Sequence, residues 1–266
     1  MVKRLLISSY IVLVFTSILS AEVGIPYRYP LSVTNSFKSG EYLSYTVSFG
    51  FYTGATANLS VNDTIYNGIP SYYIKAHAQT IGVADYLYKI RDRYETIIDS
   101  NTHLPHLSIR DINEGRYHHY NEVTYNRKEA EAISKRSGVH KLTADIQDIL
   151  STFYFARNNA FSENLNPNQI LIFKPFFCDK IFELILQYRG TEMVETKFGE
   201  IECYKFSLCE RKENKIETLE HMSFWVSRDG NRAPIKVQFE IVVGSFVVEL
   251  DKYAGVQYPF MFNKSK

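Results

Sequence analysis

The sequence is poor in the residues that mark several classes of protein. Its 266 residues include three cysteines and one tryptophan, and 30 basic residues nearly balance 29 acidic ones, for a net charge of +1. Three cysteines are too few to hold a fold together by disulfides, so the hydrophobic core must provide the stability. A balanced chain also lacks the clustered basic surface that nucleic acids require. We therefore expect a globular protein with no nucleic-acid partner.

Motifs for catalysis and for cofactors are also missing. There is no Gly-x-Ser-x-Gly elbow, no Gly-rich phosphate loop after a strand, and no HExxH or CxxC spacing. His103 and His106 straddle a turn, and the adjacent His118 and His119 point to opposite faces of a strand, so neither pair suits a zinc site. The sequence predicts no metal and no cofactor, and it identifies no catalytic residue.

The first twenty-one residues have the composition of a secretory signal peptide. Lys3 and Arg4 precede an apolar run, and small residues precede Glu22. The run covers only 15 residues, short of the roughly 20 needed to span a bilayer, so we favour a cleaved signal over a membrane anchor. No cysteine lies near the cleavage point to accept a lipid, and no later stretch is apolar enough to span. We expect a periplasmic protein that is not a lipoprotein and has no transmembrane span, with a mature net charge of −1.

Export permits disulfides, but the cysteine spacing argues against most of them. Cys203 and Cys209 are six residues apart in a strand-like segment, which separates them by about 20 Å. A cross-strand pair with Cys178 stays open. We expect buried, unreactive thiols.

Abundant aromatic residues and an alternating pattern predict β-structure. The chain has 20 Tyr and 18 Phe, which favour strands. Residues 22–36 look like an extended lead-in, and polar and apolar side chains alternate from Glu41 onward. Further short runs lie at residues 55–62, 71–80, 86–98, 106–112, 116–125, 169–178, 180–190, 201–210, 219–228, 233–243 and 245–253. We predict a single all-β domain over residues 37–258, formed by a strongly curved antiparallel sheet or half-barrel of about 11–13 strands.

One segment has helical spacing. Apolar residues occur at 146, 149, 150, 153 and 154, which predicts a helix near residues 145–157 that packs on the sheet. Thr143 or Asp145 would be its N-cap, and Asn158-Asn159 marks its end.

The two halves of the domain resemble each other. Residues 42–50 are similar to 182–190, and Asp99 with Pro105 is similar to Asp229 with Pro234. A duplicated β-meander over residues 37–125 and 169–253 would explain this pattern. The general similarity of all β-meanders would explain it equally well.

Several short motifs together resemble an exported bacterial domain-of-unknown-function family, numbered 3108. The motifs are Ser39–Tyr45 (GE-x-L-x-Y), Tyr88–Glu95 (YK-x-RDRYE), Arg110–Tyr117 (R-x-I-x-EG-x-Y), Asp145–Ser151 (D-x-D-x-LS), Phe198–Cys203 (G-x-F/I-x-C), Pro234–Val237 and Gly244–Phe246. The resemblance covers about residues 37–253. It implies a β-rich periplasmic protein with no established activity, and it supplies no catalytic residues.

A charged cluster on one predicted strand is the candidate site. Asp92 shares a face with Tyr88, Tyr94 and other apolar residues, so its carboxylate must be paired, hydrogen-bonded or protonated. The candidate residues, which form either a ligand-binding surface or a structural ion-pair network, are Tyr88, Arg91, Asp92, Arg93, Tyr94, Arg110, Asp111 and Tyr117.

Three functions are compatible with these residues. The first, which we favour, is a non-enzymatic binding or carrier protein that holds a lipid or other amphipathic or hydrophobic envelope ligand in a curved, Tyr-lined sheet. The second is an envelope enzyme acting on glycan through Asp92 or Asp111. The third is a structural or assembly partner of an envelope complex, which would expose an apolar patch outside any cavity.

Overall fold

The structure is a computed structural model that describes residues 35–161, 164–213, 215–242 and 244–263. The predicted signal peptide and nearly all of the lead-in lie outside the described residues.

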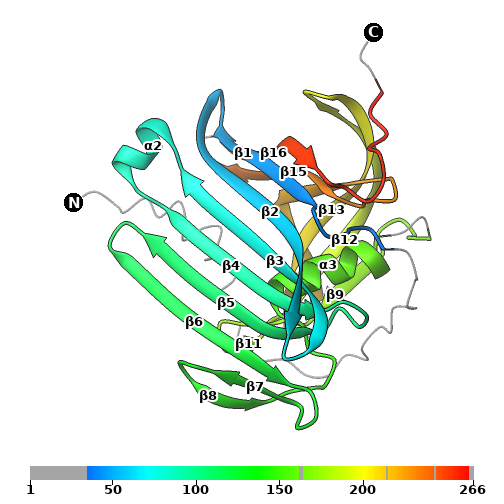
Figure 1. Ribbon diagram of the computed structural model, residues 1–266. Helices are drawn as coiled ribbons and strands as arrows, with labels where there is room; N and C mark the ends of the chain where they lie inside the picture. The colour runs from blue at the N-terminus through cyan, green and yellow to red at the C-terminus, as the bar shows by residue number, and fades with distance from the viewer. Residues whose placement is uncertain (1–34, 162–163, 214, 243, 264–266) are drawn as a thin grey trace.

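Antiparallel strands dominate the fold, as the alternation predicted (Figure 1). The strands of the N-terminal half are β1 (Tyr42–Phe49), β2 (Tyr52–Tyr66), β3 (Ile69–Thr80), β4 (Arg91–Asp99), β5 (Pro105–Glu114), β6 (Tyr117–Asn126), β7 (Glu131–Ser134) and β8 (Gly138–Lys141). Those of the C-terminal half are β9 (Ile170–Phe173), β10 (Phe176–Phe177), β11 (Lys180–Ile181), β12 (Leu184–Thr196), β13 (Gly199–Lys212), β14 (Lys215–Ser227), β15 (Pro234–Ile241) and β16 (Gly244–Ala254). The helices in the described residues are α2 (Gly82–Leu87) and α3 (Ile149–Asn159).

Fourteen strands form one curved, open sheet. Their order is β8-β7-β6-β5-β4-β3-β2-β1-β16-β15-β14-β13-β12-β9, and β10 pairs only with β11. The first and last strands, β1 and β16, are neighbours at the centre, so each half of the chain is a meander that runs to one edge. The sheet has more strands than the 11–13 predicted because β7 and β8, four residues each, were missed. The proposed duplication stays a prediction.

The segment before β4 differs from the prediction. A strand over residues 86–98 was expected, but residues 82–87 form α2 and β4 begins at Arg91. Asp85 accepts hydrogen bonds from Thr80 Oγ1 (2.7 Å) and Arg91 Nη1 (2.6 Å). These local side-chain contacts stabilise a helical turn where the apolar pattern alone favours a strand.

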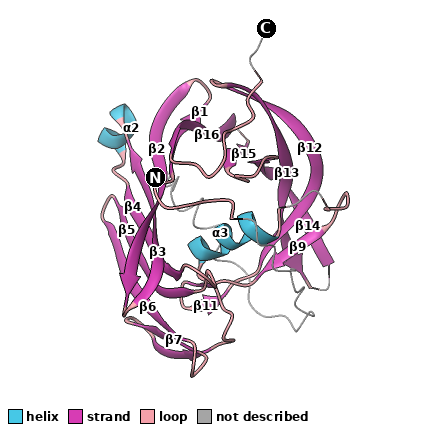
Figure 2. Cartoon of the chain, turned by 45° about the vertical axis from the view of Figure 1, so that its right-hand side comes forward, coloured by secondary structure: helices cyan, strands magenta, loops and turns pink. Residues whose placement is uncertain are grey.

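The second helix, α3, lies inside the curve of the sheet, between β1–β6 on one side and β12–β14 on the other (Figure 2). Its N-cap is Asp148, so the prediction of Thr143 or Asp145 is wrong. Asp148 accepts hydrogen bonds from the backbone N–H groups of Leu150 (2.8 Å) and Ser151 (3.1 Å), and the Ser151 hydroxyl completes a capping box. The helix ends at Asn159, as predicted.

The core lies on both sides of α3. Toward the N-terminal half, Leu150 and Tyr154 pack with Phe37, Ile74 and Ile98. Toward the C-terminal half, one cluster collects Ala156, Ala160, Phe161, Leu171, Phe173, Leu186, Tyr188, Tyr204, Phe206, Leu208 and Val226. The concave face is therefore filled by the helix along much of its length, which leaves little room there for a buried ligand.

Candidate functional site

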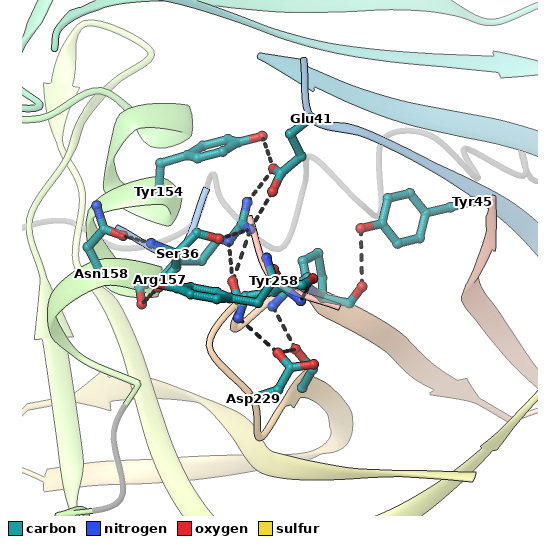
Figure 3. Close-up of polar contacts among 12 residues, drawn as sticks. Ser36, Glu41, Tyr45, Tyr154, Arg157, Asn158, Asp229 and Tyr258 are labelled. Atoms are coloured by element: carbon teal, nitrogen blue, oxygen red, sulfur yellow. Dashed lines mark hydrogen bonds and ion pairs between the residues drawn. The ribbon is translucent and has the colours of Figure 1, made fainter. Parts of the chain in front are cut away.

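The most buried polar cluster joins three distant segments (Figure 3). Arg157 and Glu41 are both 0% exposed, and the guanidinium reaches the two carboxylate oxygens at 2.6 and 2.7 Å. It also donates to the backbone carbonyls of Ser36 (2.9 Å) and Asn231 (3.0 Å). Its nitrogens all have partners, so this cluster is structural and offers nothing to a ligand.

The predicted charged cluster divides between the two faces of the sheet. Asp92, Tyr94 and Arg110 lie on the concave face, because Tyr94 is directly opposite Arg110 and strand side chains alternate. Arg93 and Asp111 are paired on the convex face, with 3.0 Å between Nη2 and Oδ2. The predicted cluster therefore consists of an ion pair on the convex face and a separate set of side chains on the concave face.

Three other predicted residues lie toward one end of the sheet. Arg91 pairs with Asp85 of α2, and its hydrogen bond lowers the pKa of Asp85 to about 2. The Tyr88 hydroxyl donates to the Glu114 carbonyl (3.2 Å), and Tyr117 is exposed at the start of β6. Arg91 thus connects α2 to β4, and Tyr88 connects the segment after α2 to the β5–β6 turn.

Asp92 is buried beside a second carboxyl. Its side chain is 8% exposed and accepts a hydrogen bond from the Asn113 backbone N–H (3.0 Å), while Glu114 beside it is 5% exposed. The pKa of Asp92 is raised to about 7, mainly by burial and also by the charge and hydrogen bond of Glu114, while the Asn113 N–H and Arg110 act in the opposite direction. No ion pair of Asp92 occurs within the described residues. Its neighbours are therefore the Glu114 carboxyl and, at longer range, the charge of Arg110.

A small pocket opens between the concave face of β4–β6 and the β10–β11 hairpin. Its volume is about 40 Å³. Tyr94, Arg110 and His119 form the sheet side, and Phe176 and Phe177 form the hairpin side. Burial lowers the pKa of His119, and Arg110 lowers it further, so the imidazole is neutral at pH 7. The pocket therefore combines aromatic walls with one cation, Arg110, and its lining also includes Glu95, Asp148 and Asp179.

Arg110 lacks an acidic partner. Its guanidinium lies over the Phe177 ring (5.3 Å to the centroid), and Nη1 lies 3.2 Å from Cys178 Sγ. Nε is buried without a hydrogen bond, and Arg110 makes no ion pair in the parts of the chain that the structure describes. The Phe177 ring and the Tyr94 side chain stabilise the guanidinium where it lies, and its unpartnered Nε can still donate a charge-assisted hydrogen bond to an anion.

The hairpin that covers the pocket has a tight turn. Cys178 (φ 52°) and Asp179 (φ 60°) both adopt the left-handed conformation that a two-residue type I′ turn requires. Asn121 Nδ2 donates to Asp179 Oδ1 (2.9 Å) and ties the turn to β6. Cys203 and Cys209 are buried free thiols as expected, but Cys178 is an exposed free thiol, so the expectation of burial is wrong at this position. Burial of its sulfur raises the pKa of Cys178, so it is no activated nucleophile.

A second, open cleft of about 520 Å³ lies over β12, β14, β15 and β16. Trp225 lines it, and most of its charged side chains are in ion pairs. Glu192 pairs with Lys205 (2.9 Å), Lys236 pairs with Glu249 (3.3 Å), and Lys197 pairs with Asp251. Because both lysines of the cleft already have acidic partners, the Arg110 pocket is the stronger candidate.

The comparison with protein families identifies the chain's relatives. Residues 44–251 match the family described as "Protein of unknown function (DUF3108)", as the motifs suggested. The chain belongs to the DUF3108 family. The match includes the whole Arg110 pocket, with β4–β6 and the β10–β11 hairpin, but begins three residues after Glu41.

The comparison with solved structures found chains similar to this DUF3108 chain. A β-barrel-like protein of the DUF1849 family from Brucella abortus has a TM-score of 0.52 at 7% identity, over 80% of this chain and 96% of that one. A protein from Parabacteroides distasonis, described as a "putative lipoprotein", has a TM-score of 0.36 at 10% identity, over 83% and 99%. The first shows a common fold alone. No curated protein matches the sequence.

The described residues of this DUF3108 chain lack two further features. No group of three or more His, Cys, Asp or Glu side chains is placed to hold a metal ion. No helix there is long and apolar enough to cross a membrane.

Sequence reasoning found part of the sheet side of the pocket and missed the hairpin side. Tyr94 and Arg110 were predicted, but His119 and Asn121 on the sheet and Phe177 on the hairpin were not. The strand-like runs at 169–178 and 180–190 meet at Cys178-Asp179, and this break was the available indication of a hairpin. Its position over β4–β6 depends on contacts that no local pattern contains.

Proposed function

We propose that the protein is a non-enzymatic binding protein of the bacterial envelope that holds the end of an amphipathic anion in the Arg110 pocket. The observation that carries the proposal is the guanidinium of Arg110, which lies among aromatic rings without an acidic partner in the described residues.

The pocket supplies the two kinds of contact that such a ligand needs. Tyr94, Phe176 and Phe177 offer apolar surface to a hydrocarbon or aromatic group. Arg110 offers a charge-assisted hydrogen bond from its unpartnered Nε to a carboxylate, sulfate or phosphate oxygen.

The size of the pocket limits how the ligand binds. A volume of about 40 Å³ has room for about three water-sized groups. A whole acyl chain does not fit, so only the headgroup and the adjoining atoms would enter. This departs from a carrier that encloses its cargo, because α3 fills the centre of the curve.

Calorimetry with a simple amphipathic anion tests the site. We expect decyl sulfate, titrated below its micelle concentration, to bind the wild type and to bind Arg110→Gln about 10- to 150-fold more weakly, because a charge-assisted hydrogen bond contributes about 1.5–3 kcal/mol. Neutral decyl maltoside should bind weakly to both proteins.

Arg93→Gln is the matched control. Arg93 is on the adjacent strand but on the convex face, where it pairs with Asp111 and Glu95. Equal decyl sulfate affinities for wild type, Arg93→Gln and Arg110→Gln would refute the proposed site.

An envelope location is part of the proposal. It is supported by the composition of residues 1–21, with a basic start, an apolar run and small residues before Glu22. Detection of the mature chain in a periplasmic extract, without its first twenty-one residues, would test it.

The glycan-enzyme alternative has one observation in its favour, the raised pKa of Asp92 beside Glu114. It requires two carboxyls that face an open cleft. Both side chains are buried, and neither lines the Arg110 pocket or the Trp225 cleft. The binding function is therefore better supported.

A further inference from the structure

One end of the molecule carries an exposed apolar surface that the Arg110 pocket does not use. The β1–β2 turn, α2, the β5–β6 turn and the β15–β16 turn all lie at this end, because successive connections of a meander alternate between its two ends. α2 lies at the end of β3 and β4 in Figure 1. We call the exposed residues there the apolar rim, which consists of Phe51, Tyr52, Val83, Tyr86, Leu87 and Val242.

Contacts within the fold connect these turns into one surface. The Tyr52 hydroxyl accepts a hydrogen bond from the Ala84 backbone N–H (3.1 Å), which joins the β1–β2 turn to α2. Phe49 packs against Phe246 (5.0 Å between centroids), next to the β15–β16 turn. The β5–β6 turn joins from the other side, where Gly115 lies against the Tyr88 ring.

The side chains of the apolar rim are exposed to an unusual degree. Phe51 and Val242 are fully exposed, Tyr86 is 91% exposed and Leu87 is 74% exposed, and α2 has no buried residue. Scattered apolar residues are normal on a protein surface, but a group of them on adjoining turns marks an interaction site.

The charges beside the rim indicate what it binds. Lys89 follows α2 and Arg116 lies in the β5–β6 turn, and both are exposed without an ion pair in the described residues. The acid of α2, Asp85, is neutralised by Arg91 (2.6 Å). The rim thus joins projecting apolar side chains to unpaired cations, the combination that suits the interface of an anionic membrane.

We propose that this end of the protein docks on an anionic lipid bilayer, with the apolar rim inserted among the acyl chains and Lys89 and Arg116 at the headgroups. A bilayer with anionic headgroups fits better than an apolar protein partner, because the exposed cations Lys89 and Arg116 lie beside the apolar rim. The docking surface goes beyond the proposed ligand site and does not depend on Arg110.

Vesicle flotation tests the docking surface. We expect the wild type to float with vesicles of phosphatidylethanolamine and phosphatidylglycerol and to bind pure phosphatidylcholine more weakly. Phe51→Ser/Tyr86→Ser/Leu87→Ser should reduce partitioning by about tenfold or more, since each apolar side chain buried in the bilayer contributes favourably. Lys89→Glu/Arg116→Glu should remove the preference for phosphatidylglycerol.

A matched control uses exposed apolar residues elsewhere. Ile65 and Val139 are 75% and 60% exposed outside the apolar rim, and Ile65→Ser/Val139→Ser should partition like the wild type. The proposal is overturned if the wild type does not float with the vesicles, or if the triple serine variant and the double glutamate variant both float as well as the wild type. It is also overturned if the wild type does not bind vesicles and light scattering shows that it self-associates through the apolar rim.

The two proposals can fail separately. Rim variants that lose vesicle binding but still bind decyl sulfate as the wild type does would support docking and show an intact fold. Loss of decyl sulfate binding in Arg110→Gln with unchanged flotation would concern the ligand site alone.

Discussion

At the scale of single residues, Asp92 is a carboxyl whose pKa lies far above its ordinary value and within the pH range in which proteins are studied. Its carboxyl is buried beside Glu114, and burial raises its pKa to about 7 from an ordinary value of 3.8. Below about pH 4 the carboxyl is protonated in both the folded and the unfolded chain. Between about pH 4 and 7 the folded chain holds a proton that the unfolded chain has lost.

Asp92 should therefore make the protein less stable as the pH rises. Its contribution is fully present below the unfolded pKa and is lost as the pH passes through the folded value near 7. We expect Asp92→Asn, which mimics the neutral acid, to be more stable than the wild type at pH 8 by about 1–3 kcal/mol, and to differ little at pH 4. Urea unfolding at both pH values measures this difference.

Asp111→Asn is the control for the Asp92 variant. Asp111 lies on the convex face in a partly exposed ion pair with Arg93, and loss of such a pair costs about 1 kcal/mol or less. If the difference in unfolding free energy between the wild type and Asp92→Asn is the same at pH 4 and pH 8, Asp92 is not a buried, protonated carboxyl.

The sequence was informative about Asp92 and silent about its neighbour. A carboxylate in an apolar row of an alternating strand had to be buried, and it is. The alternation also placed Arg93 on the opposite face. The proximity of Glu114 depends on the register between β4 and β5, which hydrogen bonds across the sheet determine.

At the scale of elements, α3 depends on the contacts of its first residue. Asp148 is buried and accepts hydrogen bonds from Leu150 N, Ser151 N and Thr96 Oγ1 (2.7 Å). Thr96 is on β4, so the same carboxyl begins the helix and attaches it to the sheet.

Removal of this cap should destabilise the whole domain. We expect Asp148→Ala to lower the free energy of unfolding by about 1–3 kcal/mol, since it removes the cap and leaves buried donors unpaired. Asp145→Ala is the control, because Asp145 is exposed and should change the stability by about 0.5 kcal/mol or less. Urea unfolding that showed equal losses for both variants would contradict Asp148 as the N-cap.

Long elements were predictable and short ones were not. The strand runs and the helical spacing of Ile149, Leu150 and Phe153 gave the right element types. α2 and β7–β8 are six residues or fewer, and at that length local hydrogen bonds such as Thr80–Asp85 outweigh the apolar pattern. The N-cap was misplaced because Asp145 and Asp148 are equally plausible without knowledge of Thr96.

At the scale of the whole molecule, the Glu41–Arg157 pair connects the beginning of β1, α3 and the β14–β15 connection. These groups are 116 residues apart in the sequence, and no local pattern could have joined them. The curved, all-β architecture followed from composition and alternation, whereas the pairing of β1 with β16 and the filling of the curve by α3 required the complete fold.

Breaking this pair should destabilise the protein severely. We expect Arg157→Met to lower the free energy of unfolding by about 3–5 kcal/mol, because it leaves the Glu41 carboxylate buried without a counter-ion. Glu41→Leu/Arg157→Met should regain part of the loss. Arg228→Gln is the control, because it breaks a partly exposed pair with Glu202 (2.7 Å) and should lower the free energy of unfolding by about 1 kcal/mol or less. Equal losses for Arg228→Gln and Arg157→Met in chemical denaturation would contradict the account.

The central claim is that Arg110 binds the head of an amphipathic anion. Native mass spectrometry of the protein, purified from cells without detergent, tests it most directly. We predict that the wild type and Arg93→Gln carry an added mass that fragments to an anionic amphiphile, and that Arg110→Gln lacks it. An Arg110→Gln protein that carries the same adduct in the same proportion, or a wild type with no adduct and no affinity for decyl sulfate, would contradict the claim.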